Sequence, residues 1–237
     1  MDVDIVCVGF GPATGGFLTT LSKNLLKEDG TPVVESQAMP GMPPQVICYE
    51  RADDVGFGVS GVVTPARRIK ASFPQLDPAQ IPMAAPVKSE KVAYLLDPIG
   101  ASRRSLALRS ADVVLKLFKG KDHAIELPWI PPFLAKHDGL VLSMGQFMQW
   151  VGAQAMGSGT VQVWPSTPAS SALVEDKKVV GVRLIDQGVE KNGTPTGAFT
   201  PGMDIRAALT VIGDGPVGAL GQQLDREFGM PEGHHTY

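Results

Sequence analysis

The order of apolar and polar positions at the start of the chain predicts a strand, a tight turn and a helix in direct succession. Residues 2–8 form a short apolar run rich in β-branched side chains, which is typical of a buried strand. The segment Gly9-Phe10-Gly11-Pro12-Ala13 follows, and residues 14–27 then have a helix-like pattern. This succession is typical of α/β proteins with parallel strands.

The rest of the chain alternates between apolar runs and amphipathic stretches. Ser143 is a candidate helix N-cap, because Gln146 lies three residues after it and apolar residues at core spacing follow. The last strand ends in a second glycine turn that contains an acid, Gly213-Asp214-Gly215. We expect strands at 45–50, 161–164 and 205–212, a hairpin from 172–174 and 178–185, a helix at 144–156, and a last helix ending near 228.

Segments rich in glycine and proline separate these elements and predict loops. Residues 28–44 indicate an excursion between the first helix and the second strand, and residues 186–202 indicate a polar loop. Residues 51–61 form a glycine-rich loop with backbone amides that can face a planar ring. Residues 73–137 are broken by prolines, with a strand-like piece at 91–96 and a basic amphipathic piece at 103–121, and predict an inserted region.

The composition is that of a globular protein of one large domain or two interleaved ones. The chain has 237 residues, 43% of them hydrophobic, and a net charge of −3. It contains no basic run, so we expect no nucleic-acid partner, and no apolar stretch long enough for a spanning helix. Because the N-terminus enters a strand directly, we expect no signal peptide. Cys7 and Cys48 lie on strands expected to be neighbours, and we interpret both as reduced core residues that hold no metal.

The first glycine turn has the chemistry of a dinucleotide site. A helix that starts after a strand and a turn presents free N–H groups and the positive end of its dipole to a pyrophosphate. Gly9 permits the turn, and Gly11 lets the backbone approach the ligand. The third small position of the fingerprint falls on Thr14, and Gly15 offers close helix–strand packing one residue later. The alternative is a glycine-rich turn of another α/β protein.

Glu50 is the candidate for the acidic half of this fingerprint. It closes the apolar run 45–49, where a carboxylate accepts hydrogen bonds from ribose hydroxyls. The long loop before the second strand accounts for its distance from Gly9. The alternative is an ordinary surface carboxylate at a strand end. The four histidines lie outside any motif, and we interpret them as surface residues.

Taken together and in order, these pieces resemble the N-terminal part of the electron-transfer flavoprotein–ubiquinone oxidoreductases, FAD enzymes of the glutathione-reductase-like superfamily. The loop from Asp186 to Met203, which closes on Pro201-Gly202-Met203, is the piece most specific to this family. The other matching segments are Val8–Ala13, Glu50-Arg51 with Val55-Gly56, Val59-Ser60-Gly61, Pro128–Pro132, Gly139–Val141, Lys178–Arg183 and Val211–Gly215.

The resemblance implies roles for ten residues. By this resemblance Gly9, Gly11, Pro12 and Ala13 hold the FAD pyrophosphate, Glu50 with Arg51 beside it binds the adenosine ribose, Ser60 and Gly61 lie near the isoalloxazine, and Asp214 and Gly215 form the second FAD turn. The chain departs from the family at Thr14, which replaces the usual third glycine, and at Ser143, where many members have an arginine. A 4Fe–4S cluster is expected only in the C-terminal part of such enzymes, which this chain lacks.

We therefore expect an α/β, Rossmann-like FAD-binding domain of the glutathione-reductase-like type, with an interleaved α+β region and a β-meander or hairpin. Residues 1–72 and 138–237 form this domain, which is incomplete, and residues 73–137 form an inserted region on the quinone and membrane side. The apolar, proline-rich segment from Leu127 to Leu134 predicts a peripheral membrane contact, and the alternative is that it packs as ordinary core.

The implied function is transfer of electrons from electron-transfer flavoprotein to a quinone, in the cytoplasm or peripherally on the inner face of the membrane. One alternative is a related FAD-dependent monooxygenase or lipid reductase. Another is a non-catalytic FAD-domain fragment, or one half of a split enzyme.

Overall fold

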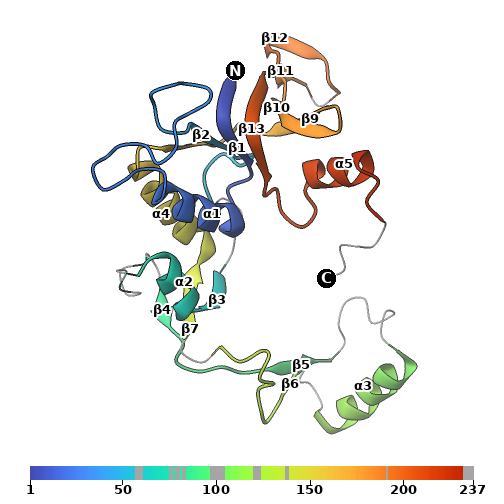
Figure 1. The fold of residues 1–237 in the computed structure, drawn as a ribbon. Coiled ribbons are helices and arrows are strands. Elements are labelled where there is room, and N and C mark those ends of the chain that lie inside the picture. The colour runs from blue at the N-terminus through green and yellow to red at the C-terminus, as the bar shows by residue number, and fades with distance from the viewer. Residues whose placement is uncertain are drawn as a thin grey trace.

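A six-stranded sheet forms the centre of the fold, in the order β8-β2-β1-β13-β10-β9 (Figure 1). The computed structural model describes residues 1–56, 61–74, 77, 81, 84–96, 105–119, 124–136, 139–190 and 192–231. Strands β8, β2, β1 and β13 are parallel, and β10 and β9 extend the sheet in the antiparallel sense. Their bounds are β1 (Asp2–Val8), β2 (Val46–Tyr49), β8 (Val161–Trp164), β9 (Ala169–Glu175), β10 (Lys178–Leu184) and β13 (Asp204–Ile212).

Helices cover both faces of this sheet, which confirms the predicted α/β class and the Rossmann-like arrangement (Figure 1). Helices α1 (Pro12–Ser22) and α4 (Met144–Gly157) pack side by side on one face, and α5 (Ala219–Glu227) packs on the other. Because side chains of a strand alternate between faces, Cys7 of β1 lies in the core beneath α1 and α4, and Val8 lies in the core beneath α5.

A smaller three-stranded sheet adjoins the helix layer. It consists of β3 (Gly61–Pro65), β7 (Gly139–Ser143) and β4 (Ala85–Pro86), with β7 in the middle, and α2 (Ala66–Ser72) follows β3. Ile69, Leu140 and Leu142 are buried between this sheet and its helix. Strand β4, from the predicted inserted region, therefore pairs directly with β7 of the predicted FAD domain.

Another part of the predicted inserted region projects away from these layers (Figure 1). It contains the two-stranded ribbon of β5 (Ala93–Leu95) and β6 (Ala124–Glu126), which carries α3 (Leu106–Lys119). The Tyr94 hydroxyl donates a hydrogen bond of 2.6 Å to the Asp112 carboxylate and joins ribbon to helix. The strand-like piece expected at 91–96 is thus present within tighter bounds, and the basic amphipathic piece at 103–121 contains a helix.

Two expected elements differ from the observed ones. The first helix begins at Pro12, because proline is well suited to the first position of a helix, and it ends at Ser22 where the chain turns. The predicted polar loop at 186–202 contains a hairpin of β11 (Gln187–Val189) and β12 (Pro195–Thr200). Every residue of β12 is exposed, so no apolar alternation marks it as a strand.

The long excursion after α1 is fastened to the first strand by a buried carboxylate. Asp4 accepts hydrogen bonds from the Ser36 hydroxyl at 2.6 Å, Gln37 N–H at 2.6 Å and Gln45 N–H at 2.7 Å. Burial raises the pKa of Asp4, but these bonds and one from Ala38 together lower the pKa below its ordinary value. The carboxylate is therefore held ionised, and it orders a segment that would otherwise have few contacts.

Candidate functional site

The two glycine turns meet at the carboxyl edge of the parallel strands. Gly9 follows β1 and Gly213 follows β13, which are neighbours in register. The Gly213 N–H donates to the Val8 carbonyl at 2.8 Å, and the Gly9 N–H donates to the Tyr49 carbonyl at 2.8 Å. Gly9 has a φ of 83°, and a Cβ there would lie 2.5 Å from the Gly213 carbonyl oxygen. Gly9 therefore has to be a glycine because of the fold itself.

Gly11 lies in a different environment. A Cβ built at Gly11 would meet no atom within 4 Å, so the space beside it is open. Gly11 is the N-cap of α1, has no side chain to cap the helix, and is followed by a first turn without an acid. The N–H groups of the first turn thus lack a side-chain acceptor, which is the arrangement that binds a phosphate. This part of the structure fits a dinucleotide pyrophosphate.

Thr14 takes the third small position and lies between the helix and the second turn. It is buried, and its hydroxyl has no hydrogen-bond partner among the described residues. A Cβ at Gly213 would lie 2.1 Å from the Thr14 Oγ1, so Gly213 supplies the room that Thr14 needs. We expected Gly15 to allow close packing of the helix on the strand. Instead, Gly15 faces the Met148 side chain of α4. The close approach is made by Gly213, in the turn after the neighbouring strand β13.

The Glu50 side chain lies directly beside the first glycine turn. Its Oε2 accepts a hydrogen bond from Phe10 N–H at 2.6 Å, and its Oε1 accepts one from Ala52 N–H at 2.8 Å. An ionised carboxylate has about four acceptor positions. The two backbone hydrogen bonds leave about two acceptor positions of Glu50 unused while its side chain holds the turn.

Asp214 turns toward its own helix. Its Oδ2 accepts hydrogen bonds from Leu220 N–H at 2.9 Å and from Gly221 N–H at 3.4 Å, and it caps the N-terminus of α5. The formal N-cap residue, Gly218, has no side chain to do this. Gly215 is exposed and has a φ of 89°. One oxygen of the Asp214 carboxylate is therefore engaged in capping α5, and the backbone at Gly215 is exposed.

The remaining predicted site residues are placed less specifically. Arg51 is exposed after Glu50, and Pro12 and Ala13 are exposed in the first turn of α1. Ser60 lies outside the described residues, while Gly61 begins β3 opposite Ser143.

Ser143 caps α4 by accepting a hydrogen bond from Gln146 N–H, as its sequence position predicts. The four histidines also lie outside the part of the chain that the structure describes.

The two cysteines face each other on neighbouring strands. Cys7 and Cys48 are in register on β1 and β2, are completely buried and form no disulfide. Burial raises the pKa of the Cys7 thiol to about 12 and also raises that of Cys48. Within the described ranges, no three or more side chains of the types that bind metals are grouped together.

The apolar segment from Leu127 to Leu134 is largely exposed. The exposed fractions are 60% for Trp129, 79% for Phe133 and 44% for Leu134, and Ile130 is half-buried. The segment therefore does not pack as ordinary core within this chain. Of the helices that the structure describes, none has the length and apolar content needed to cross a membrane.

Comparison with known proteins confirms the resemblance that the motifs indicate. The chain is 27% identical to the electron transfer flavoprotein–ubiquinone oxidoreductase of Pseudomonas aeruginosa, over 97% of this chain and 36% of that protein. It is 29% identical to the mitochondrial enzyme of Caenorhabditis elegans, over 99% of this chain and 34% of that protein. The chain thus spans about a third of the length of the curated relatives it matches. No model of a protein family matches the chain.

Solved structures share the fold at lower sequence identity. A geranylgeranyl bacteriochlorophyll reductase-like protein from Thermoplasma acidophilum superposes with a TM-score of 0.53 and 17% identity, over 93% of this chain and 41% of that one. The flavin-dependent brominase Bmp2 superposes with a TM-score of 0.51 and 14% identity, over 96% of this chain and 41% of that one. These likenesses bear on the fold alone.

Proposed function

We propose that this relative of the electron transfer flavoprotein–ubiquinone oxidoreductases is the FAD-binding part of an enzyme that passes electrons from electron-transfer flavoprotein to a quinone. The observation that carries the FAD assignment is the open space at Gly11, beside the uncapped start of α1. The Glu50 carboxylate, 2.6 Å from the Phe10 nitrogen, adds a ribose acceptor at the same turn. The proposed electron donor and electron acceptor are those stated in the names of the relatives.

The residues of the chain bind and orient, and FAD, when bound, supplies the electron-transfer chemistry. The N–H groups at the start of α1 hold the two phosphates, and Gly11 keeps the approach free of a Cβ. Glu50 fixes the adenosine end through hydroxyl groups. Asp214, by capping α5, sets the backbone of the second turn at the edge where the first turn also lies. Arg51, Ser60 and Gly61 complete the proposed site.

We propose further that the segment from Leu127 to Leu134 brings the enzyme to the bilayer, where a lipid-soluble quinone resides. Trp129, Phe133 and Leu134 are each exposed, and the segment follows β6 in the projecting region in the lower part of Figure 1. Burial of each such side chain in the bilayer interface contributes about 1.5–3 kcal/mol to the free energy of binding. Three of them provide enough apolar area for a peripheral contact.

The deciding experiment is a visible absorbance spectrum of the purified chain, before and after incubation with FAD. We expect a bound flavin spectrum, and its loss in Gly11→Val. The matched control is Gly197→Val on β12, because that glycine also has open space around it but lies far from the turn. Equal flavin content in both variants would contradict the FAD site.

Electron transfer is tested separately on the flavin-loaded protein. Reduced electron-transfer flavoprotein should bleach the absorbance of the bound flavin, whereas buffer without a reductant should not. A short-chain quinone should then restore the absorbance. A flavin that binds but is not reduced by this donor would contradict the proposed donor and leave the FAD site standing.

A further inference from the structure

A cavity of about 390 Å³ lies between α1, α2 and α4 and is also lined by Thr64 of β3 and Leu142 of β7. This volume is that of a small-ligand pocket. Its wall is mainly apolar and is formed by Ile69, Phe73, Leu142, Met144, Phe147 and Met148. Ile69, Leu142 and Met148 are buried, so the deeper part of the wall belongs to the packed interior, while Phe73, Met144 and Phe147 are half-buried.

Arg68 is the charged side chain among the described residues that line this cavity. It is exposed at the rim, and no described carboxylate forms an ion pair with it. The polar Thr19 also lines the cavity, but its hydroxyl already donates to the Gly15 carbonyl at 2.7 Å. The cavity thus offers an apolar interior with a guanidinium at its mouth.

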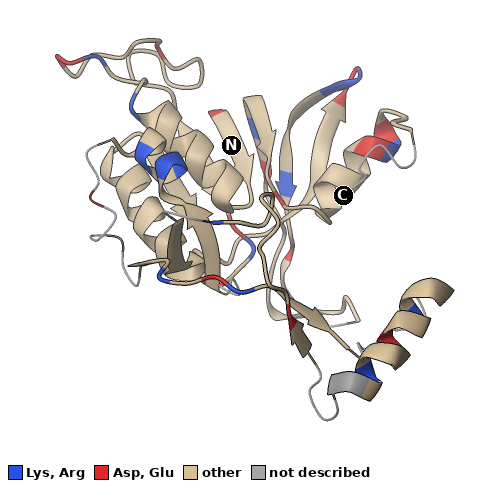
Figure 2. Ribbon diagram, turned by 90° about the horizontal axis from the view of Figure 1, so that it is seen from below, with Lys and Arg blue, Asp and Glu red and all other residues tan. Residues whose placement is uncertain are grey.

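The helices around the cavity strengthen this charge pattern. The sequences of α1, α2 and α4 contain no aspartate or glutamate. Helix α2 carries Arg67, Arg68 and Lys70, and the Lys23 ammonium lies 4.9 Å from the centre of the Phe73 ring. Figure 2 shows blue residues without red ones on this group of helices. A rim of one sign attracts ligands of the other.

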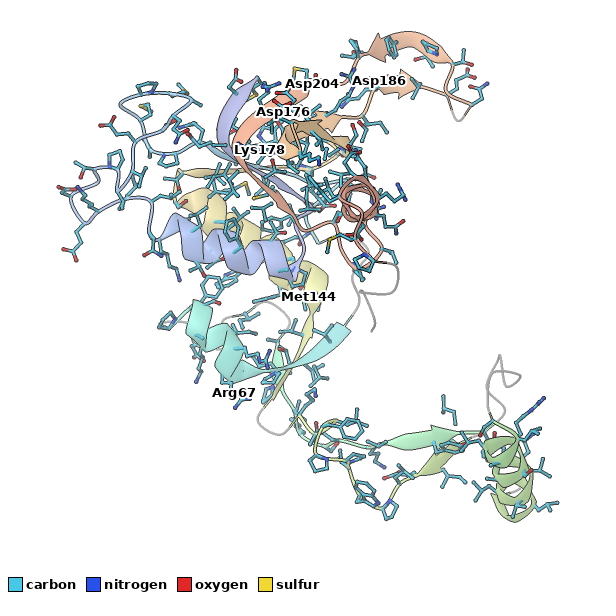
Figure 3. All side chains as sticks on the ribbon, turned by 45° about the vertical axis from the view of Figure 1, so that its right-hand side comes forward. Arg67, Met144, Asp176, Lys178, Asp186 and Asp204 are labelled. Atoms are coloured by element: carbon cyan, nitrogen blue, oxygen red, sulfur yellow. The ribbon has the colours of Figure 1, made fainter. Side chains whose placement is uncertain are left out.

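We propose that this cavity binds an anionic amphiphile, with its apolar tail between the helices and its carboxylate or phosphate group at Arg68. Figure 3 labels Met144, at the start of α4, and Arg67 on α2, the two helices whose side chains meet at the cavity. Pro12 and Ala13 also line the cavity, so it adjoins the proposed cofactor turn. The proposal does not depend on electron transfer to a quinone.

The ligand chemistry is tested by titration calorimetry on the flavin-loaded chain with four probes. Decanoate and decyl phosphate carry both tail and charge, decanol lacks the charge, and acetate lacks the tail. We expect decanol and acetate to bind at least about tenfold more weakly than the better of the two charged amphiphiles. Decanol loses the hydrogen bond between two charged groups, and acetate loses the burial of the apolar tail. The preference between decanoate and decyl phosphate identifies the natural headgroup.

Four variants locate the site. Arg68→Gln should weaken binding of the charged amphiphile by about tenfold, whereas Arg67→Gln, on the same helix but away from the cavity lining, should leave it unchanged. Gly16→Leu fills the cavity, because Gly16 lines it and has open space for a side chain, and should abolish binding. Gly157→Leu, an equally open helical glycine on the exterior, is its control.

Three results would overturn the proposal. One is decanol binding as tightly as the charged amphiphiles, and another is an equal effect of Arg67→Gln and Arg68→Gln. The third is stoichiometric release of FAD by decanoate, which would assign the cavity to the cofactor itself. Circular dichroism and retained flavin in each variant show that it is folded, and the probe comparison on the unmodified chain needs no variant.

Discussion

The Glu50 carboxylate accepts a hydrogen bond from the Phe10 N–H at 2.6 Å, so the end of β2 is tied directly to the turn after β1. A second bond, from Ala52 N–H, holds the loop that follows β2. Glu50 therefore supports the shape of the turn as well as offering acceptors to a ribose. A substitution at Glu50 is expected to alter both stability and flavin affinity, and the two effects have to be measured apart.

Glu50→Ala leaves two backbone N–H groups without their acceptor and removes a ribose partner. We expect the free energy of unfolding of the flavin-free protein to fall by about 1–3 kcal/mol, and flavin affinity to fall by a similar amount. Glu50→Gln keeps one acceptor oxygen and should lose less stability. Urea unfolding and flavin titration separate the two quantities, and a stability loss with unchanged affinity would show that Glu50 is a structural carboxylate only.

The two glycines of the first turn should respond differently to substitution. Gly9→Ala places a Cβ 2.5 Å from the Gly213 carbonyl oxygen at a positive φ, so it should cost at least about 1–3 kcal/mol of stability. Gly11→Ala meets no atom and should leave stability nearly unchanged. Thermal unfolding of the flavin-free variants checks this contrast, which would be contradicted by equal losses in the two.

Asp4 should make the protein sensitive to acid. Its folded pKa is below the ordinary value of 3.8, so in acid the unfolded state binds more protons than the folded state. Its contribution to stability is complete well above 3.8 and is lost as the pH falls through the folded pKa.

Asp4→Asn should therefore destabilise the protein near neutrality, and its difference from the unmodified chain should shrink in acid. Urea unfolding at a series of pH values measures this. Glu35→Gln, at an exposed carboxyl on the same excursion, is the control and should differ little at any pH. A constant difference between Asp4→Asn and the unmodified chain down to low pH would show that the carboxylate charge is not what matters.

Trp129 is the strongest test of membrane contact. Trp129→Glu should reduce binding to anionic lipid vesicles by about tenfold or more, because it replaces an apolar side chain of the proposed contact with a charge. Trp164→Glu is the control, since Trp164 is also exposed, at 51%, but lies on β8 of the main sheet. Vesicle flotation with equal binding of both variants would argue that the segment contacts protein instead.

The buried thiols should be unreactive in the folded protein. Burial raises the pKa of Cys7 to about 12 and also raises that of Cys48, so the reactive thiolate is scarce at neutral pH. Labelling with a thiol reagent should proceed only on unfolding, with both cysteines released together. Fast labelling of one cysteine in the native state would contradict the core packing around β1 and β2.

The sequence predicts the parts of this fold that depend on local patterns. The run 2–8, the Ser143 cap and the hairpin of β9 and β10 each follow from periodicity or from a capping residue, and all are present in the structure. Glu50 could be assigned because its position at a strand end is itself a local signal.

Contacts across long stretches of sequence could not be predicted in this way. The bond from Ser36 to Asp4 depends on how the long loop folds back, and nothing in the local pattern marks this acid as an acceptor. The fit of Thr14 against Gly213 is of the same kind, since the two residues meet only because β1 and β13 are neighbours. The hairpin of β11 and β12 could not be predicted for a different reason, because every residue of β12 is exposed and carries no periodic signal.

The place of β13 beside β1 has a consequence for how the molecule acquires its structure. The Met1 carbonyl accepts from Arg206 N–H, and Asp2 pairs with Arg206, so the first strand gains this neighbour only when the chain beyond residue 204 is available. Contacts of such large sequence separation carry a high loop-closure entropy and slow folding. On the ribosome, the first strand and its glycine turn therefore wait, with one edge unpaired, until β13 has been synthesised.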